Sequence, residues 1–117
     1  MLKVKRVYEL RSDGDGLRVL VDRLWPRGLR KDEAGVDLWL KDVAPSAALR
    51  RWFSHDPRKW EEFCRRYRDE LDRNPEALQA LRQAIAGKDT AALLYAARDD
   101  KHNNAVALRD FVEGMEK

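Results

Sequence analysis

The side chains best suited to chemistry gather in one short segment, directly after a buried, strand-like run. The segment offers a carboxylate, an indole, two guanidiniums and a glycine: Asp22, Arg23, Trp25, Arg27 and Gly28. In open α/β sheets, ligands bind beyond the carboxyl ends of the strands. The planar fork of arginine suits phosphate and carboxylate, and glycine lets a ligand approach the backbone. The pattern predicts a small-anion site. The structural alternative is that Asp22 pairs with an arginine and Trp25 covers the core.

A second polar segment follows the strongly apolar run 90–97 and opens the last predicted helix. It contains Asp99, His102 and Asn103. Free N–H groups at a helix N-terminus attract anions, and a histidine can act as acid or base near neutral pH. The competing interpretation is that Asp99 or Asn103 only caps the helix. If the second strand and the run 90–97 are parallel neighbours, this segment and 22–28 share one pocket.

A third candidate is His55, which lies between two predicted helices beside aromatic residues. It is interpreted either as a hydrogen-bonded corner histidine or as part of the pocket rim. The candidate catalytic residues are therefore Asp22, His102 and His55. Two histidines and one cysteine match no zinc spacing, and the chain has no glycine-rich phosphate loop, so neither a metal nor a cofactor is expected.

The bulk composition restricts where the protein works and what it binds. The single cysteine, Cys64, excludes an internal disulfide, which fits a reducing, cytoplasmic compartment. No run approaches the length needed to span a bilayer, so no membrane role is expected. Residues 1–31 hold nine Lys and Arg against four Asp and Glu, whereas the remainder is slightly acidic. This asymmetry favours an anionic partner, although a solvated basic edge strand would look the same.

The spacing of apolar residues predicts the elements that must position these segments. Strands are predicted at 2–10, 17–24 and 90–97, with a short strand or helical turn at 36–40. Helices are predicted at 46–53, 57–73, 75–86 and from 105 onward, with Ser46, Asp56 and Asn74 preceding the first three. The sequence therefore predicts a small α/β layered domain, Rossmann-like in general architecture, with three to four strands and four to five helices.

The link between the first two predicted strands also carries a topological prediction. Residues 11–16 form a turn rich in glycine and aspartate. This turn is too short for the helical crossover that parallel neighbours need. The first two strands are therefore predicted to be antiparallel, unless they are not neighbours.

The run 19–28 resembles the signature of the YeaO-like family, a bacterial and archaeal domain of unknown function. The likeness continues through 37–41, 44–46, 49–57 and 60–67, and ends with 93–99 and 102–103. It covers nearly the whole chain, which implies a single YeaO-like domain over 1–117. Lys41, in a matched segment, joins the ligand-binding candidates.

The resemblance also implies what this chain lacks. Longer relatives often place a Cys-His-Arg motif at the N-terminus of the last helix, near Asn103, Asn104 and Ala105. Here Asn103 replaces the thiol, and Asn104 stands where many close relatives have histidine. Nucleophilic cysteine chemistry is therefore not expected at this loop.

Three functions remain open from the sequence. The first is a pocket for a small anionic ligand, such as a nucleotide or a phosphorylated metabolite, with or without catalysis. The second is association with nucleic acid through the basic N-terminal quarter. The third is a non-catalytic interaction module in which Trp39 is an exposed anchor. The oligomeric state stays open.

Overall fold

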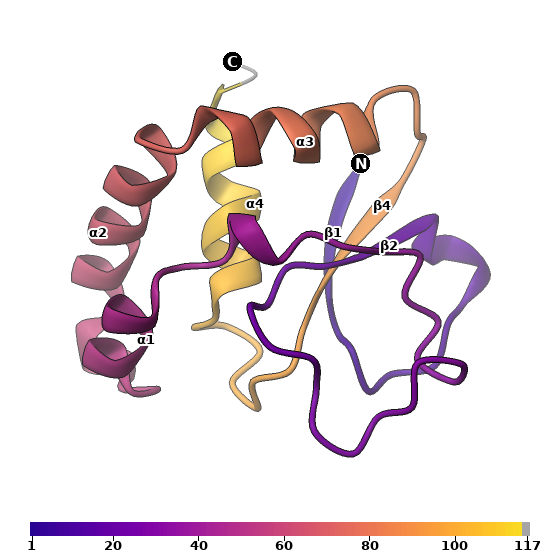
Figure 1. Ribbon diagram of the computed structural model, residues 1–117, viewed down its shortest axis with the longest axis horizontal. Helices are drawn as coiled ribbons and strands as arrows, with labels where there is room; N and C mark the ends of the chain where they lie inside the picture. Colours follow the sequence, from indigo (N-terminus) through magenta and orange to yellow (C-terminus); the bar gives the residue numbers. More distant parts are fainter. Residues whose placement is uncertain (116–117) are drawn as a thin grey trace.

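The computed structural model describes residues 1–115, which form a four-stranded sheet and four α-helices (Figure 1). The strands are β1 (Leu2–Arg6), β2 (Leu17–Leu20), β3 (Leu38–Trp39) and β4 (Ala91–Tyr95). Their order across the sheet is β1-β4-β2-β3, and every pair is parallel. The predicted α/β class and the predicted numbers of strands and helices are confirmed.

The sheet order meets the exception in the prediction for the first two strands, because they are not neighbours. Strand β4 lies between β1 and β2, and both pair with it in parallel, with Val4 and Val19 flanking Leu93. All five residues of β4 are buried, as is usual for a central strand of a parallel sheet. The connection 7–16 crosses β4 as a loop with one short 3-10 turn, Asp13–Asp15, and contains no α-helix. Strands β1 and β2 also end earlier than predicted.

The helices are α1 (Ala47–Phe53), α2 (Trp60–Asp72), α3 (Pro75–Ile85) and α4 (Asn104–Met115). Their predicted starts are confirmed by side-chain caps. Ser46 Oγ accepts from Leu49 N–H, and Asn74 Oδ1 accepts from Ala77 N–H. Asp56 caps a 3-10 turn, Pro57–Lys59, that leads into α2. Each cap satisfies a backbone donor that a helix start otherwise leaves unpaired.

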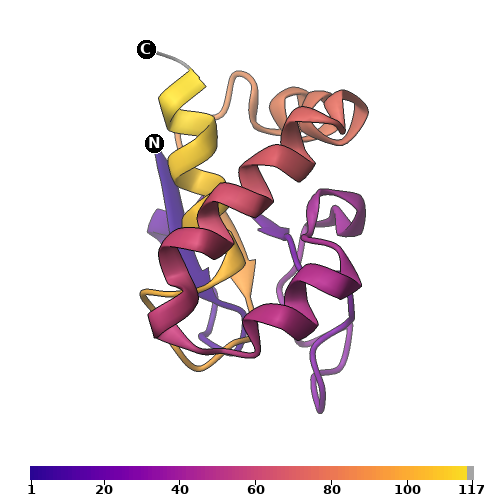
Figure 2. The same cartoon turned by 90° about the vertical axis from the view of Figure 1, so that its left-hand side faces the viewer.

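The two faces of the sheet are covered differently. Side chains of all four helices pack on the face that presents Val19, Leu93 and Tyr95. The opposite face, with Leu20 and Leu94, is covered by half-buried side chains of the loop between β2 and β3, namely Trp25, Leu29 and Val36, and by Trp39 of β3. Figures 1 and 2 show the helices gathered on one side of the sheet and the irregular segments on the other. The segment after β2 therefore folds over the sheet instead of extending into solvent.

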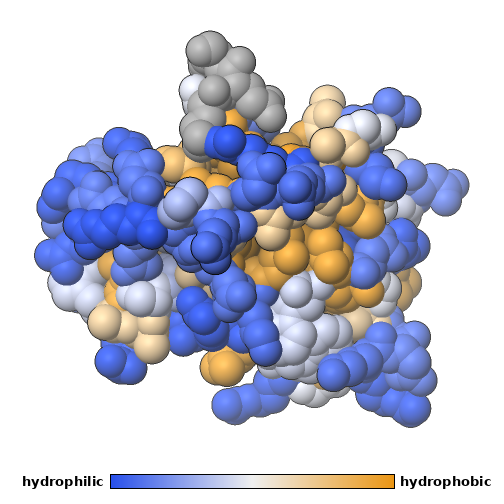
Figure 3. All heavy atoms as spheres, turned by 45° about the horizontal axis from the view of Figure 1, so that its top comes forward, coloured by the Kyte–Doolittle hydropathy of each residue, from blue (hydrophilic) through white to orange (hydrophobic). Residues whose placement is uncertain are grey.

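The outer surface of α2 is heavily charged. In the space-filling view of Figure 3, hydrophilic residues cover the left-hand part of the molecule, where α2 lies. Glu62 accepts hydrogen bonds from both Arg65 and Arg66 one turn later. Such pairs three and four residues apart are typical of a solvent-facing helix surface. No helix in residues 1–115 combines the length and the apolar character needed to cross a bilayer.

Candidate functional site

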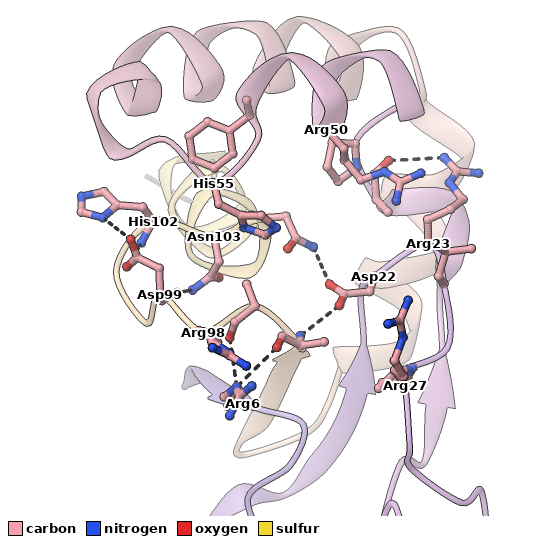
Figure 4. A pocket seen from close by; sticks show the side chains of 18 of the residues that line it. Arg6, Asp22, Arg23, Arg27, Arg50, His55, Arg98, Asp99, His102 and Asn103 are labelled. Atoms are coloured by element: carbon pink, nitrogen blue, oxygen red, sulfur yellow. Dashed lines mark hydrogen bonds and ion pairs between the residues drawn. The ribbon is translucent and has the colours of Figure 1, made fainter.

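A pocket of about 890 Å³ opens beyond the carboxyl ends of β1, β2 and β4 (Figure 4). The pocket is lined by the segment after β2, the segment after β4, the start of α4 and residues in and around α1. The two polar segments singled out in the sequence thus face one cavity. This follows from the parallel pairing of β2 with β4, which directs both carboxyl ends to the same edge.

Most of the predicted site residues line this pocket. They are Asp22, Arg23, Trp25, Arg27, His55, Asp99, His102 and Asn103. Gly28 and Lys41 are not among its lining residues. Gly28 has φ of 76°, a left-handed backbone conformation that suits glycine, so it serves the turn. The Lys41 ammonium lies 5.3 Å from the centre of the Trp39 ring.

The carboxylate of Asp22 is held by groups from two other elements. Its Oδ2 accepts from Ala96 N–H at 2.9 Å, just after β4, and its Oδ1 accepts from Asn104 Nδ2 at 3.0 Å, at the start of α4. Burial raises the pKa of Asp22, while these hydrogen bonds and the charge of Arg50 lower it. The net shift is upward. The predicted loop-closing pair with an arginine is therefore replaced by a backbone amide and a side-chain amide.

Five arginines line the pocket: Arg6, Arg23, Arg27, Arg50 and Arg98. Arg6 Nε donates to the carbonyls of Ala96 and Ala97, and Arg23 makes only a 3.5 Å contact to Ala44 O and a 3.8 Å ion pair with exposed Asp42. Within residues 1–115, the guanidiniums of the other three have no hydrogen-bond acceptor, and Nε of Arg50 is buried without a partner. The pocket therefore holds cationic groups that the fold does not neutralise.

Three of these arginines, Arg6, Arg50 and Arg98, were not predicted from the sequence to be site residues. Arg6 ends β1 and Arg98 follows β4 by three residues, so the rule that located 22–28 could have located them too. Arg50 lies on α1, and only the packing of that helix against the sheet brings it to the pocket. No local sequence signal marks Arg50.

The segment before α4 is organised by its own caps. Asp99 Oδ1 accepts from the N–H groups of Lys101 and His102, and Asp99 Oδ2 lies 2.9 Å from His102 Nδ1. These hydrogen bonds, led by that from Lys101 N–H, hold the pKa of Asp99 below its usual range. Asn103 Oδ1 accepts from Val106 N–H, which makes Asn103 the N-cap of α4. The capping interpretation therefore describes the geometry of Asp99 and Asn103.

The two histidines lie at different places on the rim. The His102 ring packs edge-on against Trp60, with 5.3 Å between ring centres, and Figure 4 shows it at the far side of the pocket from Arg50. His55 is exposed, and both it and Ser54 have positive φ, at 56° and 48°. No hydrogen bond to the His55 ring is present within residues 1–115, so the corner is not held by that side chain.

Trp39 and Cys64, two further residues considered in the sequence, lie outside this pocket. Trp39 is half-buried, contacts Trp25 edge-on and donates its indole N–H to Asp22 O at 2.8 Å, so its role as an exposed anchor is wrong. Burial raises the pKa of the Cys64 thiol to about 11, so the reactive thiolate form is disfavoured. In residues 1–115, no three His, Cys, Asp or Glu side chains are grouped to hold a metal ion.

Comparison with known proteins covers almost the whole chain. The model of the family described as the inactive DUF488-N3 subclade matches residues 1–116. The chain is 42% identical to the uncharacterized protein Rv3073c of Mycobacterium tuberculosis over 113 residues, which are 97% of this chain and 94% of that protein. It is 36% identical to the uncharacterized protein YeaO of Escherichia coli over 114 residues, 97% of this chain and 98% of that protein. No solved structure matches the chain.

Proposed function

The chain belongs to the family described as the inactive DUF488-N3 subclade, as the YeaO-like signature predicted, and from this premise we propose that it binds a small anionic molecule in the pocket of Figure 4. A nucleotide or a phosphorylated metabolite is the expected ligand class. The word inactive in the family's description and the asparagine at position 103 both favour binding without nucleophilic catalysis.

The observation that carries this proposal is the imbalance of charge around the cavity. Five arginines and two aspartates line it. Asp99 is paired with His102, and Asp22 accepts two hydrogen bonds from the protein. Three guanidiniums have no acceptor within residues 1–115. Guanidinium groups held in one concave site recognise phosphate and carboxylate through paired donors.

The cavity also has the size and the walls of a small-molecule site. Pockets for such ligands span roughly 300–1,000 Å³ and are mostly apolar with a few placed polar groups. About 890 Å³ is available here. Apolar side chains supply much of the wall, among them Leu24, Pro45, Phe53 and Phe63. A ligand with an organic body and an anionic group fits this composition better than a bare inorganic ion.

The basic N-terminal quarter offers less to nucleic acid than its charge count suggests. Lys5 and Arg18 are both paired with Asp15, and Arg11 is paired with Asp37. These cations are already paired with carboxylates of the fold. The unpaired guanidiniums of Arg27, Arg50 and Arg98 converge on one pocket, although Arg27 and Arg98 are exposed, whereas phosphate-backbone binding uses cations spread along a surface.

Thermal shift and calorimetric titration with phosphate, pyrophosphate, AMP, ADP and citrate test the proposal. At a ligand concentration of 100 Kd, stabilisation is about 2.7 kcal/mol. Arg50→Gln removes a charged donor pair, so the best ligand should bind roughly 10- to 100-fold more weakly. Arg51→Gln is the matched control, because Arg51 is the next residue of α1 but is exposed and outside the pocket. A native chain unmoved by every probe, or equal affinities in the two variants, would refute the proposal.

A further inference from the structure

A small acceptor site lies among the arginines of the pocket. Figure 4 shows Asp22 between Arg23 and Arg50 on one side and Arg6 and Arg98 on the other. Asn104, from the first turn of α4, reaches Asp22 directly, with Nδ2 at 3.0 Å from Oδ1. Both side chains line the cavity.

The carboxylate of Asp22 keeps acceptor capacity for a ligand. An ionised carboxylate offers about four lone-pair positions. Two are used, one by Ala96 N–H and one by Asn104 Nδ2. Both donors belong to the protein framework, so they fix the direction of the carboxylate and leave its remaining positions for a group in the cavity. No lysine or arginine within residues 1–115 forms an ion pair with Asp22 within 4 Å.

The amide of Asn104 presents a second acceptor. Its Nδ2 donates to Val21 O and to Asp22 Oδ1, both at 3.0 Å. Because both of these partners are acceptors, the orientation of the amide is fixed with nitrogen toward them. Its Oδ1 has no donor within residues 1–115. Asp22 and Asn104 together therefore form two adjacent acceptors that call for hydrogen-bond donors.

We propose that the pocket selects anions that also carry an amino group, with the anionic group on the unpaired guanidiniums and the amino N–H groups on Asp22 and Asn104. This inference rests on the proposed function and narrows its ligand class. One small molecule can carry both the anionic group and the amino group, because Asp22 and Arg50 line the same cavity and the charge of Arg50 acts on Asp22.

The same geometry disfavours anions without a donor. Such a ligand would bring a negative group near the Asp22 carboxylate, and it would desolvate Asn104 Oδ1 and the remaining lone pairs of Asp22 without supplying a donor to them. An unpaired buried acceptor is costly, whereas a hydrogen bond to a charged group is among the stronger ones. The pocket should therefore bind an anion that lacks a hydrogen-bond donor more weakly than an anion of equal charge that carries one.

The test uses pairs of acids that differ only by an amino group. Calorimetry or competition binding on the unmodified chain compares benzoate with 2-aminobenzoate, succinate with aspartate, and 3-phenylpropionate with phenylalanine. We expect the amino member to bind about tenfold more tightly in at least one pair. In Asp22→Asn, that preference should shrink to less than about threefold. Asp100→Asn is the control, because Asp100 is an exposed carboxylate of the next loop that does not line the cavity.

The outcomes separate this inference from the proposed function. If both members of every pair bind equally and Arg50→Gln weakens both, anion binding stands and amino selection is refuted. If no acid of any pair binds, the inference is refuted, and the proposed function is then decided by the titrations with phosphate, pyrophosphate, AMP, ADP and citrate. Should Asp22→Asn fail to fold, the comparison on the unmodified chain still decides, because an absent preference there refutes the inference without any variant.

Discussion

Replacing Arg18 with methionine should destabilise the fold more than any surface change. Arg18 is completely buried beneath the loop-covered face of the sheet. Its guanidinium donates to Asp15 Oδ2 at 2.8 Å and to the backbone carbonyls of Gly35, Glu9 and Ala34 at 2.9, 3.1 and 3.3 Å. These hydrogen bonds connect the two loops to β2. Methionine has a similar length but no donor, so the carbonyls of Glu9 and Ala34 lose the hydrogen bond from Arg18, while Asp15 and Gly35 keep those from Lys5 and Arg11.

The magnitude follows from those contacts. Three carbonyls each lose a hydrogen bond of about 1 kcal/mol, and the buried carboxylate of Asp15 loses a charge-assisted one of roughly 1.5–3 kcal/mol. Lys5 still contacts Asp15, which limits the loss. The sum is about 4.5–6 kcal/mol, and the hydrogen bonds that Asp15 and Gly35 keep place the loss near the lower end, close to the roughly 3–5 kcal/mol for breaking a buried ion pair. Against a typical stability of about 5–15 kcal/mol, the midpoint of thermal unfolding should fall by roughly 10–20 °C.

Urea unfolding followed by tryptophan fluorescence, together with thermal melts, measures this loss. Arg51→Met is the matched control, because Arg51 is exposed on α1 and should change stability by less than about 0.5 kcal/mol. A change below about 1 kcal/mol in Arg18→Met would show that the buried cluster contributes little beyond its desolvation cost. That result would refute the assignment of Arg18 as the link between the loops and the sheet.

The remaining predictions concern protonation. Burial raises the pKa of Asp15, but hydrogen bonds from Lys5, Ser12 and Arg18 outweigh it and hold the pKa well below its usual range. The stabilisation that ionised Asp15 contributes is thus fully present above about pH 4 and is lost as the pH falls further. The urea concentration at the unfolding midpoint should therefore decrease when the pH is lowered below about 4, and it should decrease less steeply in Asp15→Asn. Equal slopes in the two proteins would contradict this prediction. Cys64 should react with iodoacetamide at pH 8 about a hundredfold more slowly in the folded chain than in urea, since its pKa is raised to about 11; equal rates would count against its burial.

The helices could be predicted well because their signals are local. Ser46 and Asn74 each accept a backbone hydrogen bond at the first turn, as their residue types indicated. The strand order could not be predicted, because nothing near β1 or β2 records that β4 inserts between them. The alternation of apolar and polar residues along β2 also gave no indication that Arg18 is buried. An arginine in a strand is normally placed in solvent, and its burial depends on acceptors supplied by residues 9, 15, 34 and 35.

The candidate site could be predicted only where its residues follow a strand that the local sequence reveals. Segments 22–28 and 99–103 follow strands, so the position of each was visible locally, and the parallel pairing of β2 with β4 brings them together. Arg50 was not predicted as a site residue, because it reaches the cavity only through the packing of α1, and the hydrogen bond of Asn104 to Asp22 likewise depends on the packing of α4. Their contribution depends on tertiary structure, and the charge count of the N-terminal quarter gave no information about it.

Under the proposed function, side chains and not the start of α4 would hold the anion. Free N–H groups at a helix N-terminus can hold an anion. Here the side chain of Asn103 already accepts from Val106 N–H in the first turn of α4, and Asp99 accepts from the N–H groups of Lys101 and His102 just before the helix. The amide of Asn103 therefore closes part of the helix N-terminus. Asn104, the first residue of α4, donates to Asp22 Oδ1 and supports that carboxylate in the pocket.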